Sequence, residues 1–411
     1  MPAGDRIKPD HRNGNPVGND VSTTLTHPSM HAACNESGDP LLLTPGPLTT
    51  SLPVKRAMLR DLGSRDRELI AVTQHIRECL LGLVDGHGSH ECVPMQGSGT
   101  FAVEAMIGTF VPRDGKLLIL VNGAYGKRMA SICEHLGLDH VVIEAAEDCA
   151  VDVLALDKAL TADADISHVA VVHCETTTGI INPLCAVADV VASHCRGLLV
   201  DAMSSFGAIP IDARRICFDA LAASSNKCLE GVPGVGFCIA RRDALEKTRG
   251  NSPSLSLDLH DQWRAMAGNG QWRFTPPTHC LLALDQALEE LIVEGGVAGR
   301  GARYRQNHRL LVEGMRKFGF ETLLPDGLQA PIIVTFLTPA DACFDFGEFY
   351  ERLRQRGFVI YPGKLTCADT FRVGCIGRLG STEIAAALAA IRAVLAELRV
   401  TSCAPATGRA A

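Results

Sequence analysis

The sequence has no excess of positive charge. Its 39 lysine and arginine residues are outnumbered by 46 acidic residues, which gives a net charge of −7 at pH 7. Proteins that bind nucleic acid or anionic membranes usually carry a basic surface. The composition therefore gives no reason to expect either partner, and small molecules are the expected ligands.

Long apolar runs are also missing. No window of the sequence holds the uninterrupted run of about 18 apolar residues that a membrane-spanning helix needs. The first residues are rich in Asp, Asn, Gly and Pro, and they contain no apolar signal-peptide segment. We expect a cytoplasmic protein.

A cysteine pattern typical of disulfides or metal sites is absent as well. The 16 cysteines form no C-x-x-C pair, and several lie inside apolar runs, among them Cys174, Cys238 and Cys280. In a chain far longer than a disulfide-stabilised mini-protein, this distribution indicates buried thiols in a reducing compartment. No metal site is predicted.

Short apolar runs alternate instead with longer amphipathic or Ala-rich segments, and no internal repeat is present. Such runs are typical of strands buried on both faces, and the segments between them fit crossover helices. We predict an α/β fold with a mainly parallel sheet. The predicted strands are "KLLILV" (116–121), "HVAVVH" (168–173), "GLLVD" (197–201), "FDALAAS" (218–224) and "VGFCIAR" (235–241).

At 411 residues the chain is long enough for two or three domains. Beyond residue 300, helical patterns at 303–319, at 346–357 and from about 383 alternate with "PIIVTFL" (331–337) and "FVIYPG" (358–363), which predicts a smaller α+β domain. Polar, aperiodic ends predict disorder. The predicted parts are a disordered extension (1–39), a segment packing near the functional site and the small domain (40–60), a large α/β domain (61–299), a small domain (300–400) and a disordered tail (401–411).

Polar clusters follow the predicted strands, at the edge where ligands of open α/β sheets bind. Asp201 ends "GLLVD", and Lys227 follows 26 residues later in "ASSNKCLEG". Residues 98–100, Ser-Gly-Thr, open a helical pattern and can cradle a phosphate, although they match neither common nucleotide-binding motif. Taken singly, Asp201 also fits a turn residue and residues 98–100 fit a plain helix cap.

The combination is what a pyridinium cofactor requires: a lysine for a Schiff base, a carboxylate for the ring nitrogen and an anion cradle for the phosphate. Tyr125 in "NGAYG", one of only four tyrosines, can stack on the ring. Taken singly, it equally fits a loop tyrosine packed on the core.

The order of several motifs extends this interpretation to the whole chain. From residue 41 to about 400, the sequence resembles the class V aminotransferases of fold type I, which bind pyridoxal 5'-phosphate. The motifs that carry the resemblance are "LTPGPLTTS", "QGSGTFAVEA", "NGAYGKRM", "HCETTTGIINPL", "VDAMSSFGAIPID", "SSNKCLEGVPGVGF", "SLSLDL", "WRFTPPTH" and "GFVIYPGKLTCADTFRVG".

The resemblance implies roles for individual residues. Lys227 resembles the Schiff-base lysine and Asp201 the partner of the pyridine nitrogen. Thr176, with Thr178 as the alternative, resembles the residue that meets the phenolic oxygen of the cofactor. The phosphate and ring contacts fall on Ser98, Gly99, Thr100 and Tyr125.

Two further roles concern the substrate and the partner subunit. Arg372 in "TFRVG" resembles the arginine that binds the substrate carboxylate, although an arginine at an unspecified position is more often a surface ion-pair partner. Thr275 in "RFTPPT" resembles a residue that reaches the phosphate of the neighbouring subunit, which implies a homodimer with shared active sites. For a phosphonate, Thr44 and Gly46 in "TPGPLTT" are the proposed contacts.

Within the family, the motifs are most similar to those of enzymes that move the amino group of 2-aminoethylphosphonate to pyruvate. The implied products are phosphonoacetaldehyde and L-alanine, which places the reaction in phosphonate catabolism. Relatives that use alanine and glyoxylate, or serine and pyruvate, share the cofactor residues. Two further alternatives are a cysteine desulfurase using Cys367 and a protein that binds the cofactor without turnover.

Overall fold

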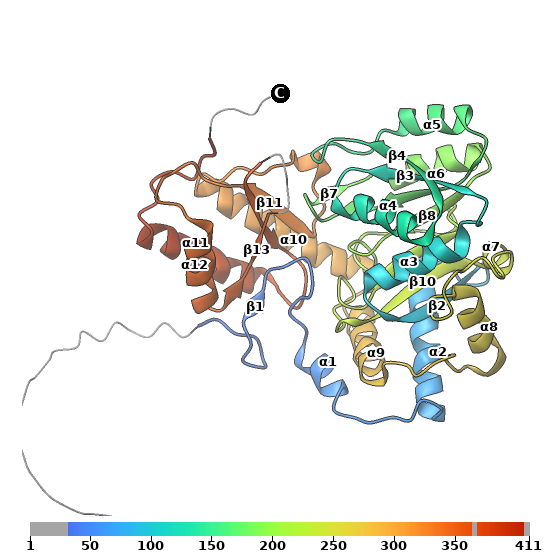
Figure 1. Cartoon of the computed structure of the whole chain (residues 1–411). Helices are drawn as coiled ribbons and strands as arrows, with labels where there is room; N and C mark the ends of the chain where they lie inside the picture. The colour runs from blue at the N-terminus through green and yellow to red at the C-terminus, as the bar shows by residue number, and fades with distance from the viewer. Residues whose placement is uncertain (1–31, 364–367, 407–411) are drawn as a thin grey trace, which may run out of the picture. The chain divides into compact units, whose positions relative to one another are not determined.

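A seven-stranded sheet organises the larger part of the computed structural model (Figure 1). Four neighbouring pairs are parallel, and one strand, β10, runs antiparallel to both of its neighbours. The predicted α/β class with a mainly parallel sheet is confirmed. In spatial order the strands are β2 (His90–Gly97), β10 (Gly234–Arg241), β9 (Ala220–Ser224), β8 (Gly197–Asp201), β5 (Ile166–Val172), β3 (Lys116–Val121) and β4 (Asp139–Glu144).

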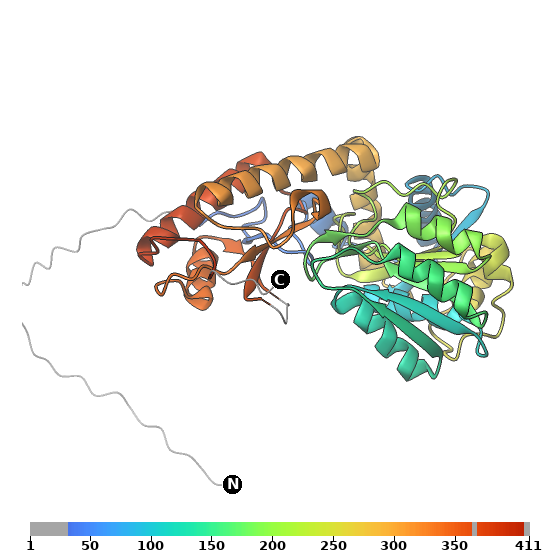
Figure 2. The same cartoon turned by 90° about the horizontal axis from the view of Figure 1, so that it is seen from above.

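Helices cover both faces of this sheet, as Figure 2 shows from above. In β3, Leu118 and Leu120 pack into the core on one face, whereas Leu117 and Ile119 pack into the core on the other. This alternation explains why the strand reads as a continuous apolar run. One face carries α2 (Arg67–Gly82), α5 (Val153–Ala162), α6 (Leu184–Ser193) and α9 (Thr278–Val293), and the other carries α3 (Gly99–Phe110), α4 (Ala124–Leu136), α7 (Arg242–Glu246) and α8 (Leu259–Asn269).

One strand of the sheet, β2, was not predicted. Its sequence "HECVPMQG" mixes polar residues with a proline, so it has neither an apolar run nor a clear alternation. The strand lies at the edge of the sheet and pairs only with β10, where Pro94 faces Phe237. An edge position tolerates a proline because the missing N–H needs no partner on the open side.

A second, antiparallel sheet lies in the C-terminal part, in the order β11-β14-β13. Leu311, Phe336 and Phe371 belong to the core between this sheet and its helices. Two short pairs complete the described structure: β1 (Leu41–Leu42) with β12 (Phe358–Val359), and β6 (Cys174–Glu175) with β7 (Ile180–Ile181). The remaining elements are α1 (Leu52–Ala57), α10 (Gly296–Lys317), a short 3₁₀ helix (Asp326–Leu328), β11 (Ile333–Leu337), α11 (Phe346–Gln355), β13 (Tyr361–Pro362), β14 (Thr370–Gly374) and α12 (Ser381–Glu397).

The structure describes residues 32–363 and 368–406. Its hydrogen bonds continue beyond both predicted limits of the folded part: the amide of Ala33 donates to the carbonyl of Arg356 at 2.9 Å, and the Asp341 carboxylate accepts from the amides of Thr401 and Ser402. Residues 1–31 and 407–411, predicted to be disordered, lie outside the described residues.

The described residues belong to one compact unit, 32–411. Helix α10 begins at Gly296 and therefore runs across the boundary predicted at 299/300. The division into 40–60, 61–299 and 300–400 stays a prediction. None of the helices in the described part of the chain is long and apolar enough to cross a membrane.

Candidate active site

A pocket of about 160 Å³ opens where β8 and β9 end and α3 begins. Parallel strands bring their carboxyl ends to the same edge of a sheet, so residues distant in sequence meet there. The structure brings six predicted residues together around this pocket: Ser98, Gly99, Thr100, Tyr125, Asp201 and Lys227.

Asp201 is the last residue of β8, and its side chain is buried. One carboxylate oxygen accepts a hydrogen bond from the backbone N–H of Met203 at 2.8 Å. Burial raises the pKa of this carboxyl to about 6, because desolvation disfavours the charged form more than the hydrogen bond favours it. A positively charged group placed beside Asp201 would lower this pKa and favour the carboxylate.

Lys227 follows β9, and its Nζ donates to the carbonyl of Pro45 at 2.6 Å. Desolvation lowers the pKa of this amine from 10.5 to about 8. Gly46 lies against the same side chain: a Cβ on Gly46 would stand 2.6 Å from Lys227 Cδ, and its φ is +111°. Only glycine combines this conformation with so close an approach. The segment with Thr44 and Gly46 therefore lies against Lys227, and the Thr44 hydroxyl donates to the carbonyl of Pro47. The contact of this segment with a phosphonate stays a prediction.

Ser98 is the N-cap residue of α3, yet its hydroxyl makes no capping hydrogen bond. A Cβ on Gly99 would overlap the sulfur of Met203, so a side chain there would displace the end of the methionine. The first N–H groups of an α-helix lack intrahelical partners and point outward with the positive end of the helix dipole. Because no side chain caps these N–H groups, the start of α3 fits an anion-binding site better than it fits a plain helix cap.

Arg128 also lines the pocket and was not predicted. Its Nη1 donates to Thr100 Oγ1 at 3.2 Å, and its guanidinium lies 4.8 Å from the centre of the Tyr125 ring. A signal was present in the sequence: Arg128 follows Tyr125 by three residues in "NGAYGKRM", and residues at that spacing share a helix face.

Thr176 and Thr178 lie in the turn between β6 and β7, and both are buried. Neither hydroxyl has a hydrogen-bond partner among the described residues. Buried hydroxyls are rarely left unpaired. Neither residue lines the pocket of Lys227, so the contact with a cofactor oxygen stays a prediction for both.

Arg372 is buried in β14 of the second sheet. Its Nη1 donates to the carbonyl of Thr176 at 2.9 Å and its Nε to the carbonyl of Pro362 at 3.1 Å. It forms no ion pair with any described residue, so the alternative of a surface ion-pair partner does not hold. After desolvation, its positive charge also contributes to the lowered pKa of Lys227.

Thr275 does not line the pocket of Lys227. It is exposed in the segment before α9, beside Phe274, whose side chain is 50% exposed. A separate hollow, lined mainly by polar groups, includes Thr275 and Arg273. Cys367 lies outside the described residues.

The model of the family "Aminotransferase class-V" matches residues 54–368 of this sequence. The chain belongs to the class-V aminotransferases. The 2-aminoethylphosphonate–pyruvate transaminase of Pseudomonas fluorescens is 56% identical over 362 residues, which cover 88% of this chain and 98% of that protein. The 2-aminoethylphosphonate–pyruvate transaminase 2 of Burkholderia lata is 56% identical over 364 residues, covering 89% and 97%.

A solved structure supports the fold of this class-V aminotransferase. The alanine–glyoxylate aminotransferase from Nostoc sp. aligns with a TM-score of 0.81 at 26% identity, covering 87% of this chain and 95% of that one. The family and the fold predicted from the motifs are confirmed.

A buried group of charges surrounds the loop after Lys227 in this class-V aminotransferase. Glu230 Oε1 accepts from the Tyr304 hydroxyl at 2.5 Å and from Arg303 Nη2 at 2.7 Å. Arg303 Nη1 continues to the carbonyl of Gly377 at 2.6 Å, just beyond β14. These bonds tie the lysine loop to α10 and to the strand that carries Arg372.

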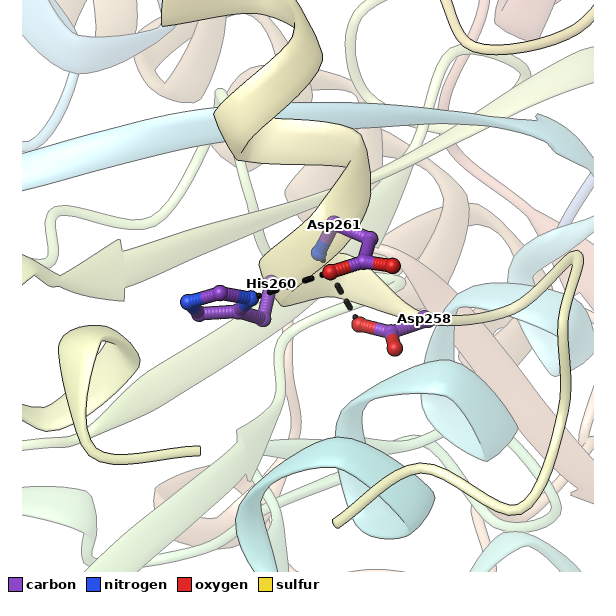
Figure 3. Close-up of side chains that lie close together, drawn as sticks. All are labelled: Asp258, His260 and Asp261. Carbon is purple, nitrogen blue, oxygen red and sulfur yellow. Dashed lines mark hydrogen bonds and ion pairs between the residues drawn. The ribbon is translucent and has the colours of Figure 1, made fainter. Parts of the chain in front are cut away.

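A cluster of possible metal ligands, formed by Asp258, His260 and Asp261, lies at the start of α8 (Figure 3). Asp258 is the N-cap of this helix and accepts from the amide of Asp261, while Asp261 also contacts His260 at 3.2 Å. Helix capping explains this arrangement in the class-V aminotransferase, because acidic groups stabilise a helix N-terminus.

Proposed function

We propose that this class-V aminotransferase transfers the amino group of 2-aminoethylphosphonate to pyruvate and so forms phosphonoacetaldehyde and L-alanine. The observation that carries the proposal is the identity of 56% along 98% of a curated enzyme that bears this name. The pocket with Lys227 and Asp201 supports it, since it offers the groups that the chemistry needs.

The residues present fit pyridoxal 5'-phosphate. The first N–H groups of α3 and the Ser98 hydroxyl would hold the phosphate, Tyr125 would stack on the ring, and an unpaired hydroxyl of Thr176 or Thr178 would meet the phenolic oxygen. When bound, this cofactor supplies an aldehyde that takes up the amino group and a ring that accepts electrons.

Lys227 has two tasks in this proposal. Its amine holds the cofactor covalently at rest, and once released it moves a proton between the amino-bearing carbon of the substrate and the cofactor. Desolvation lowers the pKa of this amine to about 8, so more of it is unprotonated near neutral pH than in a free lysine, and an unprotonated amine is the form that can accept a proton. The carbonyl of Pro45 holds the amine at the edge of the pocket.

Asp201 would hold the ring nitrogen of the bound cofactor, and its carboxylate would stabilise the positive charge of the protonated nitrogen. A carboxylate in a desolvated site acts more strongly on a nearby charge than one in water does. The hydrogen bond from Met203 fixes the orientation of the carboxylate.

Two anionic substrates use the pocket in turn, which makes the kinetics ping-pong. The guanidinium of Arg372 binds the carboxylate of pyruvate as a two-point fork. For the phosphonate, the proposed contacts are Thr44 and Gly46, in the segment that touches Lys227.

The assembly is proposed to be a homodimer with shared active sites. The exposure of Thr275, away from the pocket of its own chain, supports a contact with the cofactor of a partner subunit. The cytoplasmic location stays a prediction.

The decisive experiment measures alanine formation from pyruvate with 2-aminoethylphosphonate and with a panel of other amino donors. We expect 2-aminoethylphosphonate to give the highest kcat/KM. A preference for serine would point to a serine–pyruvate enzyme, and a preference for alanine with glyoxylate as acceptor would point to an alanine–glyoxylate enzyme. Cofactor binding without turnover of any donor would refute catalysis altogether.

A further inference from the structure

Helix α4, which carries Tyr125, begins without a cap of its own. Its N-cap residue is Gly123, which has no side chain to offer. The cap comes from the end of β6 and the turn that follows it, about fifty residues further along the chain. Tyr125 N–H donates to Glu175 Oε2 at 2.9 Å, and Ala124 N–H donates to Thr177 Oγ1 at 3.1 Å.

Glu175 is completely buried, and both of its carboxylate oxygens are in use. Oε1 accepts from the N–H of Thr177 at 3.0 Å and from the Thr177 hydroxyl at 2.6 Å. Burial raises the pKa of this carboxyl, while the hydrogen bonds from Thr177, Tyr125 and Gly126 act in the opposite direction. A charged acceptor at a helix N-terminus benefits from the dipole as well.

The absence of a side chain at Gly123 leaves room for this carboxylate. Its φ of 173° is an extended conformation open to any residue, so backbone strain does not require a glycine there. The requirement is space: a Cβ on Gly123 would stand 2.5 Å from Glu175 Cδ and 2.9 Å from Glu175 Oε2. The carboxylate occupies the place that a side chain at position 123 would fill.

The same turn reaches the substrate side of the pocket. The carbonyl of Thr176, the neighbour of Glu175, accepts from Arg372 Nη1 at 2.9 Å. Glu175 is also one of the charges that favour the protonated form of Arg372. One turn therefore fixes the proposed ring-stacking residue and holds the proposed carboxylate-binding residue.

We propose that Glu175 is a positioning residue that acts through Tyr125 and Arg372: its carboxylate anchors the start of α4 so that the tyrosine ring stands at the cofactor, and it aligns the turn that holds the arginine. This inference rests on the proposed function, because it concerns residues assigned there to cofactor and substrate.

The experiment perturbs this carboxylate in two independent ways. Glu175→Gln keeps the shape but replaces one acceptor with an NH₂ group, which opposes the N–H groups it faces. Gly123→Ala keeps the glutamate at position 175 but displaces its carboxylate by steric overlap. Gly268→Ala in α8 is the matched control, because a Cβ there meets nothing within 4 Å.

Three quantities are measured for each purified enzyme: hydrogen exchange of the amides in 123–128, the dissociation constant of pyridoxal 5'-phosphate, and the visible circular dichroism of the bound cofactor. In both variants we expect faster exchange at 123–128, an altered dichroic band and affinity for the cofactor lowered about 10-fold or more. The KM for pyruvate should rise as well, and the Gly268→Ala enzyme should match the wild type.

Non-additivity provides a further check, since residues in contact are coupled. If Gly123→Ala acts by displacing the carboxylate, the double variant should bind the cofactor no more weakly than Glu175→Gln does.

Faster exchange with unchanged cofactor affinity and dichroism would reduce Glu175 to a helix cap and overturn the positioning role. Unchanged exchange in Gly123→Ala would overturn the anchoring itself. Should Glu175→Gln fail to fold, the Gly123→Ala enzyme alone decides. Wild-type protein that binds no pyridoxal 5'-phosphate would instead contradict the proposed function, whatever the exchange data show.

Discussion

Asp201 lies at the end of β8 in the same desolvated pocket as Lys227. Asp201→Asn removes the charge but keeps the size and the acceptor for Met203 N–H. We expect the variant to fold normally and to lose about 100-fold or more in kcat, because a neutral amide cannot stabilise the protonated ring nitrogen. Steady-state kinetics measure the loss, and Asp152→Asn, at the exposed cap of α5, is the control. A near-wild-type rate would refute the role.

Lys227 links the pocket to the stability of the cofactor-free protein. The pKa of its amine is lowered from 10.5 to about 8, so between these values the unfolded chain binds a proton that the folded chain has released. Stability rises with pH wherever the unfolded state binds more protons. The free energy of unfolding of the wild type should therefore increase relative to Lys227→Met between about pH 8 and pH 10. Urea unfolding at several pH values tests this, and a constant difference would contradict a lowered pKa.

Substitution of Arg372 should affect the two half-reactions to different extents. An ammonium cannot reproduce the two-point fork of a guanidinium, so Arg372→Lys should slow the half-reaction with pyruvate about 10-fold or more. The half-reaction with 2-aminoethylphosphonate involves no carboxylate and should lose less. Single-turnover measurements with each substrate alone resolve the two.

The control for this prediction is Arg378→Lys, because Arg378 is exposed beyond β14. Equal losses in both half-reactions would mean that Arg372 also holds the phosphonate or supports the fold. An unaffected pyruvate half-reaction would place the carboxylate site elsewhere.

At the scale of elements, one buried hydroxyl joins the lysine loop to α10. Tyr304 donates to Glu230 and accepts from the N–H of Gly377 at 3.2 Å. Tyr304→Phe removes one hydrogen bond from the Glu230 carboxylate and one from the N–H of Gly377, both of which are buried. An unpaired buried polar group costs about 1–3 kcal/mol. We expect a loss of that size in urea unfolding, and almost none for Tyr350→Phe, whose side chain is only half-buried. Equal stability of the two variants would show that this bond contributes little.

The strands could be predicted where their hydrophobic patterns were clear. β3 and β8 have the predicted bounds, because both faces of each strand are buried and the residues between the two ends of each strand are apolar. β2 was not predicted, because an edge strand is paired on one side only and tolerates polar residues and proline, so its sequence lacks the apolar run of a central strand. The antiparallel direction of β10 has no signature in its own sequence.

At the scale of the whole molecule, the proposed shared site can be tested by mixing subunits. In a mixed dimer of Lys227→Ala and Thr275→Ala chains, one site carries both changes and the other carries neither. Each variant alone should be impaired, whereas random mixing should restore about a quarter of the wild-type sites. Measuring activity and cofactor content after co-refolding tests this. Without recovery on mixing, Thr275 acts within its own chain or not at the site.

The pocket illustrates how far a sequence determines a site. Lys227, Asp201 and residues 98–100 could be selected because each follows a strand or opens a helix at one edge of the sheet, and chain order alone brings such positions together. Their types, a lysine, a carboxylate and a small-residue turn, then restricted the chemistry. The family followed from the order of the motifs.

Contacts between segments far apart in the chain were decided only by the tertiary structure. The carbonyl of Pro45 accepts from Lys227, 182 residues further along the chain. Glu175 fills the space beside Gly123 and caps a helix that begins about 50 residues before it. The residue types in a sequence do not show which backbone carbonyl will accept a hydrogen bond. They also do not show whether a glycine is required by a lack of space or by the backbone conformation of a turn. Patterns along the chain report burial and local geometry, whereas the partner of a buried charge depends on how the elements pack.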